Sequence, residues 1–217
     1  MTKQLISLGL MSGTSGDGVD ASIIQSDGED HYKVLYDNYF PYNKDIFKLI
    51  HSLKDKIHSS NQLSSLNKDI KILEREITLF HANVVSSVIN HTNQKIDLIG
   101  FHGQTIYHNE KEKISRQLGD AKLLFQLVNK KVVYNFRQND LKNGGSGAPL
   151  SPIYHKLILK NNNFDLPLCV LNIGGISNIT VIKQYDLNEI ISKDIGPGNC
   201  LIDEWIRKNS KYTYDKD

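Results

Sequence analysis

The residues whose types and spacing could do chemistry lie near the start of the chain, where an apolar strand expected over residues 5–10 runs into a polar turn. We interpret residues 9–20 (GLMSGTSGDGVD) as a loop that holds phosphate groups. Glycines let backbone N–H groups approach an anion closely, hydroxyl groups donate hydrogen bonds to it, and carboxylates can hold magnesium through water. The residues with these properties are Gly13, Gly16 and Gly18, then Ser12, Thr14 and Ser15, and finally Asp17 and Asp20.

Two common nucleotide loops do not fit this stretch. A P-loop places a lysine directly after its second glycine, but residues 5–32 contain no lysine. The spacing of the glycines at 13, 16 and 18 also differs from the dinucleotide-binding fingerprint. Taken by itself, the stretch is compatible with an ordinary polar hairpin turn that carries extra glycines.

The segments that follow indicate how the loop is held. Residues 19–25 are expected to form a second strand, Asp27-Gly28 a hairpin-type turn, and residues 31–40 a third strand. The loop would then join the first two strands of an antiparallel meander. Sugar kinases and actin-like ATPases hold phosphates with a glycine-rich loop in that position.

A long helix is the clearest element of the next segment. After a loosely helical stretch over residues 43–59, Ser60 or Asn61 is expected to cap it, and apolar residues recur at spacings of three and four from Leu63 to about Asn90. That length gives a helix of about 40 Å. We expect it to pack against a sheet because its apolar stripe is wide. A coiled-coil partner helix is the alternative, and the same helix is a candidate homodimer surface.

Polar residues follow two further expected strands. Residues 97–101 should form a strand that delivers His102, Gly103, Gln104 and Thr105 at its C-terminal end, where open α/β sheets bind ligands. Asp120 is expected to cap a helix that runs to about Asn129, and residues 131–136 should form another strand that opens into a polar loop over residues 137–147. Pro149 should begin the next helix.

This order predicts an α/β fold. Three meandering strands followed by helix, strand, helix, strand and helix match a ribonuclease H-like (actin-like ATPase) first lobe, a mixed sheet flanked by helices, over residues 1–160. The strand pattern restarts over residues 168–173, 176–182 and 189–194, and residues 194–199 then lead into a helix over 200–208. We therefore expect residues 161–217 to be the incomplete start of a second, similar lobe.

Composition excludes several classes of protein. The 217 residues carry a net charge of +2 with scattered lysines, so neither nucleic acid nor an anionic membrane is an expected partner. No apolar run reaches transmembrane length, and the N-terminus leads directly into a strand, so a cytoplasmic location is expected. Cys169 and Cys200 form no disulfide framework, and the eight histidines show no zinc-type pairing.

Six blocks of the sequence together resemble the anhydro-N-acetylmuramic acid kinase family. They occur in the family's order over essentially the whole chain, which makes the resemblance specific although each block alone is weak. The blocks are GLMSGTSGDGVD (9–20), GFHGQTIYH (100–108), QLGDAKLL (117–124), NFRQNDLKNGGSGAPLSPIYH (135–155), LNIGGISNIT (171–180) and DIGPGNCLIDEW (194–205).

The resemblance implies an ATP- and Mg²⁺-dependent enzyme of cell-wall (murein) recycling. Such an enzyme opens the 1,6-anhydro bond of anhydro-N-acetylmuramic acid with water and transfers the γ-phosphoryl group of ATP to O6 of the sugar. Water attack needs a carboxylate base, and the matching residue is Asp194. Ser12 to Val19 would carry the phosphates, Asp17 or Asp20 would lie near magnesium, and residues 172–175, with Gly174 and Gly175, resemble a second phosphate loop.

Other candidate site residues have structural alternatives. Asp194 could be a turn or capping residue. His102 and Gln104 could contact sugar hydroxyls or only connect loops. Arg137 could contact substrate or form an ion pair with Asp140 that holds the turn at residues 144–147. Asn199, within the last block, is assigned to the substrate.

Two departures from the family leave two hypotheses. Gly16 stands where the family usually has leucine, and family members continue with the rest of the second lobe, including a glycine-rich adenosine-binding segment. The chain is expected to belong to a kinase, as a subsequence or with the missing C-terminal lobe supplied by another polypeptide. The alternative is a truncated, non-catalytic remnant that binds a sugar or a partner protein. By itself, the chain is expected to be inactive and prone to associate.

Overall fold

The computed structural model describes residues 3–184 and 189–212. The chain divides into two compact units, Met1–Gly147 and Ala148–Asp217, which are described separately. Within the described residues, the longest helices are too polar to cross a lipid bilayer.

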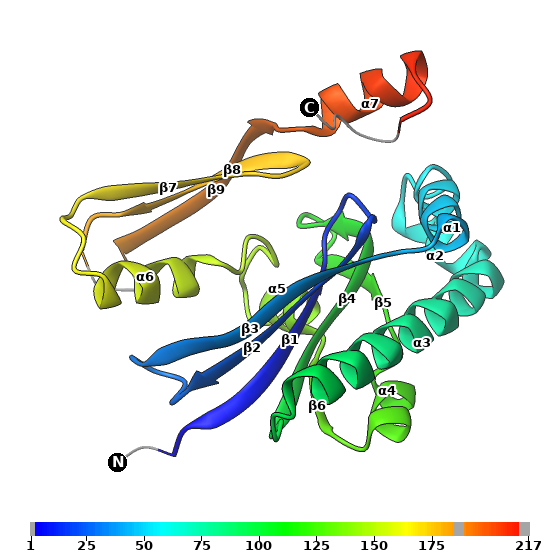
Figure 1. Ribbon diagram of the computed structural model, residues 1–217. Coiled ribbons are helices and arrows are strands. Elements are labelled where there is room, and N and C mark those ends of the chain that lie inside the picture. Colours follow the sequence, from blue (N-terminus) through cyan, green and yellow to red (C-terminus); the bar gives the residue numbers. More distant parts are fainter. Residues whose placement is uncertain (1–2, 185–188, 213–217) are drawn as a thin grey trace. The chain divides into compact units, whose positions relative to one another are not determined.

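The first unit is built on a six-stranded mixed sheet (Figure 1). Strand β1 pairs antiparallel with β2, which pairs antiparallel with β3, and on its other side β1 runs parallel to β4. The first part of β4 runs parallel to β6, and its later part pairs antiparallel with β5. The expected meander followed by parallel strands is confirmed. The strands are β1 (Leu5–Ser12), β2 (Gly18–Ser26), β3 (Tyr32–Pro41), β4 (Leu98–Asn109), β5 (Ile114–Leu118) and β6 (Lys131–Tyr134).

Helices cover one face of this sheet because alternate strand residues are apolar. Leu8 and Leu10 of β1 are buried, whereas Gly9 and Met11 between and after them are exposed. The buried side chains join those of α1, α3 and α4 in one hydrophobic core. The long helix thus packs against a sheet, as expected from its wide stripe. The helices of this unit are α1 (Lys44–Lys54), α2 (Ser60–Ser65), α3 (Asn67–Thr92), α4 (Ala121–Val128) and α5 (Phe136–Lys142).

Local capping residues explain where several helices begin. Asp120 accepts hydrogen bonds from the N–H groups of Lys122 and Leu123, so the expected cap of α4 is confirmed. The expected cap at Ser60 or Asn61 is wrong by one residue, because Ser59 forms a capping box with Gln62. That box starts the short helix α2, and the long helix α3 follows it as a separate element.

Two other expectations for the first unit are corrected. The expected loop over residues 137–147 begins as helix α5, which a single deeply buried residue, Leu141, anchors to the unit. The strand expected over residues 97–101 continues to Asn109 because its second half finds a new partner in β5. His102 to Thr105 therefore lie inside β4, at a point where Gly103 adopts φ +73°.

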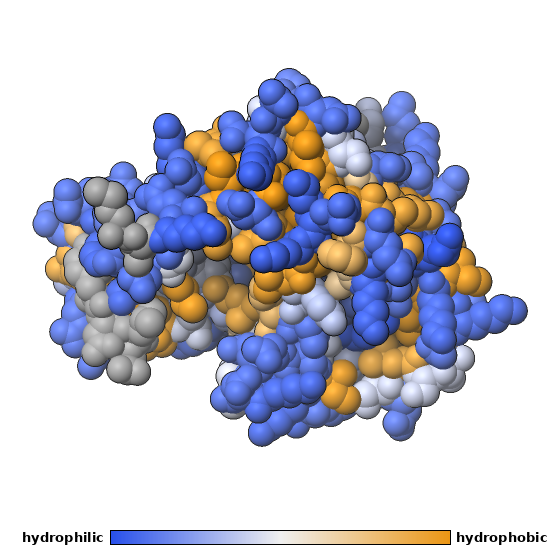
Figure 2. All heavy atoms as spheres, turned by 90° about the horizontal axis from the view of Figure 1, so that it is seen from below, coloured by the Kyte–Doolittle hydropathy of each residue, from blue (hydrophilic) through white to orange (hydrophobic). Residues whose placement is uncertain are grey.

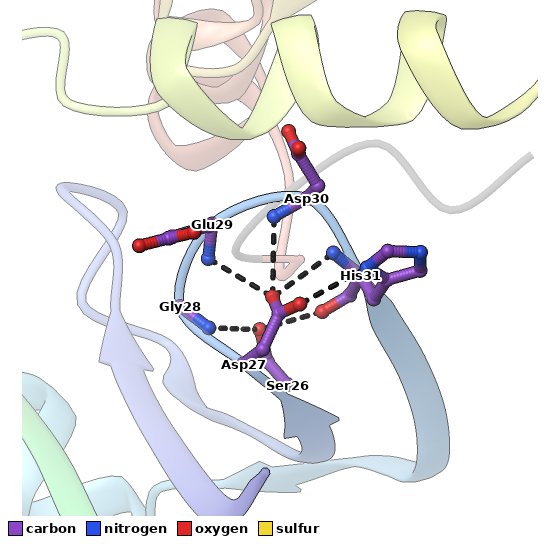
Figure 3. A network of polar contacts seen from close by, with 6 residues as sticks. All are labelled: Ser26, Asp27, Gly28, Glu29, Asp30 and His31. Carbon is purple, nitrogen blue, oxygen red and sulfur yellow. Dashed lines mark hydrogen bonds and ion pairs between the residues drawn. The ribbon is translucent and has the colours of Figure 1, made fainter. Parts of the chain in front are cut away.

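The turn between β2 and β3 is organised by one carboxylate (Figure 3). Asp27 Oδ1 accepts hydrogen bonds from the N–H groups of Glu29, Asp30 and His31, and Oδ2 lies 3.0 Å from His31 Nδ1. These donors hold the pKa of Asp27 far below its usual range. The expected turn at Asp27-Gly28 is confirmed, with Gly28 at φ +82°.

The second unit contains a three-stranded antiparallel sheet in the order β7-β8-β9. Strands β7 and β8 have the expected limits, although Leu171 and Ile173 of β7 are exposed rather than buried. Helix α6 begins at Pro152, not Pro149, since Pro152 occupies the first helical position. The elements are α6 (Pro152–Asn161), β7 (Leu168–Ile173), β8 (Ile176–Ile182), β9 (Ile190–Pro197) and α7 (Cys200–Asn209).

Apolar side chains remain on the surface of both units. Figure 2 shows one face of the molecule, on which orange apolar atoms are visible between polar side chains. In the second unit, Leu201, Ile202 and Trp205 of α7 are each at least half exposed. Exposed apolar side chains of this kind promote association.

One histidine is fully enclosed in the core of the first unit. His81 of α3 donates from Nδ1 to the carbonyl of Ile77, and its ring packs edge-on against Phe101 at 5.0 Å. Within the part of the chain that the structure describes, its Nε2 has no hydrogen-bond partner. Burial lowers the pKa of His81 to about 4, so the ring is neutral in the folded protein.

Replacement of His81 by leucine should reduce the acid sensitivity of the fold. Below the ordinary histidine pKa of 6.5, the unfolded chain binds a proton that folded His81 does not, so stability falls as the pH decreases from 6.5 towards 4. His81 should account for a loss of about 2 kcal/mol between pH 7 and pH 5. Urea unfolding of wild type and His81→Leu at both pH values measures this. An equal loss in the free energy of unfolding of both proteins between pH 7 and pH 5 would contradict a buried, neutral His81.

Candidate active site

The loop between β1 and β2 is short and closed on itself. It leaves β1 at Ser12 and enters β2 at Gly18, and the N–H of Gly16 donates to the carbonyl of Gly13 at 3.2 Å. The sequence prediction placed the candidate phosphate residues in this loop, and the structure brings them together at one end of the sheet (Figure 1).

Three successive carbonyl groups of the loop accept hydrogen bonds from protein side chains. The carbonyl of Gly13 accepts from Gln104 Nε2 at 2.8 Å, and that of Thr14 accepts from Lys54 Nζ at 2.5 Å. The carbonyl of Ser15 lies 2.9 Å from His51 Nε2. In a trans peptide the N–H points opposite to the C=O. The N–H groups of Thr14 and Ser15 therefore point away from Gln104 and Lys54, which is the arrangement an anion-binding loop needs.

The surrounding structure constrains the three glycines of the loop to different extents. Gly16 has φ +67°, and an added Cβ would lie 2.9 Å from the side chain of Ile50. A Cβ on Gly18 would lie 2.5 Å from the carbonyl oxygen of Phe40. Gly13 has room, because the nearest atom to an added Cβ, Ser15 Oγ, is 3.6 Å away. The fold thus constrains Gly16 and Gly18 to be glycine but leaves space beside Gly13.

The charge of Asp17, in the loop, acts on Asp20, which lies near the start of β2. Burial and the nearby charge of Asp17 raise the pKa of Asp20 above its usual value, and Ser15 Oγ donates to Asp17 Oδ1. A cation beside the two groups would relieve this repulsion. Magnesium commonly uses one or two carboxylates together with phosphate oxygens and water, so the pair fits such an ion. Among residues 3–184 and 189–212, no three His, Cys, Asp or Glu side chains gather as a protein-only metal site.

His102 is held by protein groups at both ring nitrogens. Nδ1 lies 2.6 Å from the carbonyl oxygen of Gly103, and Nε2 accepts a hydrogen bond from Arg137 Nε at 2.7 Å. Burial and the positive charge of Arg137 lower the pKa of His102 to about 4. Its ring is therefore neutral, and the structure gives it a connecting role between β4 and α5.

Arg137 and Asp140 both hold one peptide group of the turn at residues 144–147. Arg137 NH1 donates to the carbonyl of Gly147 at 2.9 Å, and Asp140 Oδ2 accepts from the N–H of Gly147 at 2.8 Å. Asp140 fills the space beside Gly145, where an added Cβ would lie 2.1 Å from Oδ2. Both side chains thus support the turn through Gly147, and the ion pair between them that the sequence suggested stays a prediction.

The candidate residues of the second unit lie at one end of its sheet. Asp194 is an exposed residue inside β9, opposite Asn178 of β8, so it is neither the turn nor the capping residue of the structural alternative. The strand that was expected to end at Asp194 continues to Pro197. The turn Gly174-Gly175 joins β7 to β8. The carbonyl of Gly174 accepts from the N–H of Asn199 at 2.8 Å. Gly174, Gly175 and Asn199 thus meet, and the start of α7 is fastened to this turn.

A partly buried polar cluster supports the strand that carries Asp194. His155 Nδ1 of α6 lies 2.9 Å from Thr180 Oγ1 of β8, and Ser192 Oγ of β9 lies 3.3 Å from the same oxygen. Burial lowers the pKa of His155. Because Ser192 precedes Asp194 by two residues, this cluster ties α6 to the part of β9 that presents the carboxylate.

Three residues around the phosphate loop were missed by the sequence prediction. His51 and Lys54 reach it from α1, and Tyr42 reaches it from the end of β3. The spacing of His51 and Lys54 places them on one face of a helix. Nothing local indicates which loop that face contacts, so this signal could not have assigned them.

The chain matches the family model described as anhydro-N-acetylmuramic acid kinase over residues 5–217. Three curated relatives carry the same name. One from Pelagibacter ubique is 52% identical over 100% of this chain and 58% of its own length. Those from Agrobacterium fabrum and Gluconobacter oxydans are 38% and 39% identical over 96% and 94% of this chain, and over 57% and 56% of their own lengths. The chain therefore spans somewhat more than half the length of these relatives.

Alanine at Gly18 should destabilise the chain, whereas alanine at Gly13 should leave its stability nearly unchanged. Gly18→Ala places a methyl group against a backbone oxygen and should lower the free energy of unfolding by about 1–3 kcal/mol. Gly13→Ala has space for the methyl group and should change it by less than about 0.5 kcal/mol. Chemical denaturation of the two variants measures both changes. Equal losses in the free energy of unfolding would show that the loop does not pack as described.

Proposed function

The chain belongs to the anhydro-N-acetylmuramic acid kinase family, and on that premise we propose that its first unit binds the phosphates of ATP for transfer to an amino sugar. In this proposal, water opens the 1,6-anhydro bond of anhydro-N-acetylmuramic acid while the γ-phosphoryl group passes to O6, a step of cell-wall recycling. The chain spans 58% of the Pelagibacter ubique relative, so the activity is proposed for the protein of which this chain forms a part or a subunit.

The loop at residues 12–19 is the observation that carries the proposal. Its carbonyls at Gly13, Thr14 and Ser15 are bonded to protein donors, so the N–H groups of Thr14 and Ser15 point away from Gln104 and Lys54, towards the side on which we place the phosphate oxygens. The Lys54 ammonium group at the Thr14 carbonyl adds positive charge beside the loop. Phosphoryl transfer depends mainly on positioning and on charge stabilisation, and these groups supply both.

Magnesium is the metal that the donor set suits. Asp17 and Asp20 would hold the ion, directly or through water, beside the phosphates. When bound, magnesium neutralises the charge that develops on the transferred phosphoryl group. Burial and the charge of Asp17 both raise the pKa of Asp20, and a cation beside the two carboxylates would offset the contribution of Asp17.

Asp194 is proposed as the general base that takes a proton from the attacking water. Its carboxylate is exposed on β9, and the His155 cluster holds the preceding part of that strand. Gly174, Gly175 and Asn199 lie at the same end of the second unit and would bind phosphate or sugar there. His102, Gln104 and Arg137 are proposed to support the site rather than touch the sugar, since their polar atoms bond to protein groups.

A binding role without catalysis is the second candidate. The second unit exposes Leu171, Ile173 and Ile191 on its sheet and Trp205 on α7, and large exposed apolar side chains of this kind promote association. The unit would then bind the rest of a kinase lobe, from the same or another polypeptide, or a partner protein. Turnover measurements separate this role from the kinase.

Gly13→Ala should weaken nucleotide binding without unfolding the chain. The added methyl group fits the protein but lies where phosphate oxygens would approach the backbone. We expect the affinity for magnesium ATP, measured by calorimetry, to fall at least about tenfold. Gly28→Ala, in the β2–β3 turn, is the control. An unchanged affinity in Gly13→Ala would remove the loop from the nucleotide site.

Asp194→Asn should abolish sugar turnover while nucleotide binding persists. An amide cannot accept the proton from water, so the rate should fall by about two to four decades. The rate is measured as ADP release in the presence of anhydro-N-acetylmuramic acid. It is measured for the chain alone and again after adding the part of the Pelagibacter ubique relative that this chain does not match. Asp203→Asn, on α7, is the matched control.

Two outcomes would contradict these assignments. A rate for Asp194→Asn within threefold of wild type would remove Asp194 as the base. Nucleotide binding without turnover in either wild-type preparation would contradict the kinase and favour the binding role.

A further inference from the structure

Ser12 lies at the centre of a buried polar cluster beneath the phosphate loop. Its side chain is fully buried, and its Oγ lies 2.6 Å from Gln104 Oε1, 2.9 Å from the carbonyl of Gly18 and 2.9 Å from Tyr42 Oη. A serine hydroxyl has one hydrogen to donate. The two carbonyl oxygens can only accept, so the Tyr42 hydroxyl must donate to Ser12 Oγ.

The orientation of Gln104 is fixed by its neighbours. Its amide nitrogen donates to the carbonyls of Gly13 at 2.8 Å and Thr105 at 3.2 Å. A flipped amide would turn its oxygen towards two carbonyl oxygens, which is unfavourable. Gln104 Oε1 therefore accepts from Ser12, and a directed series of hydrogen bonds runs from Tyr42 through Ser12 and Gln104 to Gly13.

These bonds hold both ends of the loop. At its start, Gln104 holds the Gly13 carbonyl. At its end, the backbone N–H of Tyr42 donates to the carbonyl of Asp17 at 2.8 Å, and Ser12 lies against the carbonyl of Gly18. We name Ser12, Tyr42 and Gln104 the loop clasp, because they join residues 13 and 17–18 across the base of the loop.

We propose that Tyr42 and Gln104 are positioning residues that keep the phosphate loop in its anion-binding shape. The inference rests on the proposed phosphate site. While Gln104 holds the Gly13 carbonyl inwards, the Thr14 N–H is directed outwards, so the loop is organised before the ligand arrives. Without the Tyr42 hydroxyl, the buried Ser12 oxygen loses its donor, and the serine that bonds Gln104 is held less firmly.

The environment of Tyr42 supports its role as a donor. Burial raises the pKa of Tyr42 above its usual value, so its hydroxyl keeps its proton at neutral pH. Its ring packs edge-on against Phe80 with centroids 4.8 Å apart, which fixes the direction of the hydroxyl group. Phe80 belongs to α3, so the clasp also connects the loop to the core.

The test uses the 217-residue chain and magnesium tripolyphosphate, a probe that carries the phosphates of ATP without adenosine. Tyr42→Phe and Gln104→Met should each weaken its binding in calorimetry by about fivefold to tenfold. Backbone amide exchange over residues 13–18, measured without ligand, should become faster in both variants. Tyr36→Phe removes a different tyrosine hydroxyl, one that accepts from Asn38 at 3.1 Å, and should leave binding within twofold of wild type.

Phe80→Leu controls for loss of stability, because it disturbs the packing of Tyr42 but leaves the hydroxyl in place. Thermal unfolding is measured for every variant. If Phe80→Leu and Tyr42→Phe lower the melting temperature equally and also weaken tripolyphosphate binding equally, the loss of affinity reflects lost stability. That result would overturn a positioning role for Tyr42. Wild-type affinity and exchange rates in Tyr42→Phe and Gln104→Met would also overturn it. A third outcome is faster amide exchange of the loop in these variants together with no binding of tripolyphosphate by wild type. This result would support the loop clasp but contradict the proposed function.

Discussion

The hydrogen bond between Gln104 Nε2 and the carbonyl of Gly13 is the interaction on which the first unit's candidate site depends. It joins the loop after β1 to β4, two segments 91 residues apart in the sequence. The bond forms only because β1 and β4 run parallel with Ser12 beside Gln104. Because the C=O and N–H groups of a trans peptide point in opposite directions, this bond directs the N–H of Thr14 away from Gln104. The register of the sheet thus determines the direction of a proposed ligand-binding group.

The rest of the first unit supports that arrangement from outside the sheet. Helix α1 places Ile50, His51 and Lys54 against the loop, where they fill the space next to Gly16 and hold the next two carbonyls. The absence of a side chain at Gly16 allows Ile50 this close approach. The loop therefore owes its shape to hydrogen bonds and packing from β4 and α1, and the phosphate-binding role proposed for it needs no lysine within the loop itself.

Local patterns predicted much of the fold, whereas long-range pairings escaped prediction. The meander, the cap at Asp120 and the limits of β7 and β8 follow from alternation and from turn residues within a few positions. Helix α5 was missed because one buried leucine, Leu141, decides it. The loop was found from its composition, but Tyr42, His51 and Lys54 act across 30 to 40 residues and depend on strand register and helix orientation.

The most direct test of the central claim is an amide NMR titration of the chain with magnesium ATP. If the loop binds phosphates through outward N–H groups, the largest shifts should fall on the amides of Thr14 and Ser15, and magnesium tripolyphosphate should reproduce them. The Asp27 turn, whose carboxylate already holds three N–H groups, should not respond. Saturable shifts confined to other parts of the chain, with Thr14 and Ser15 unmoved, would contradict the account.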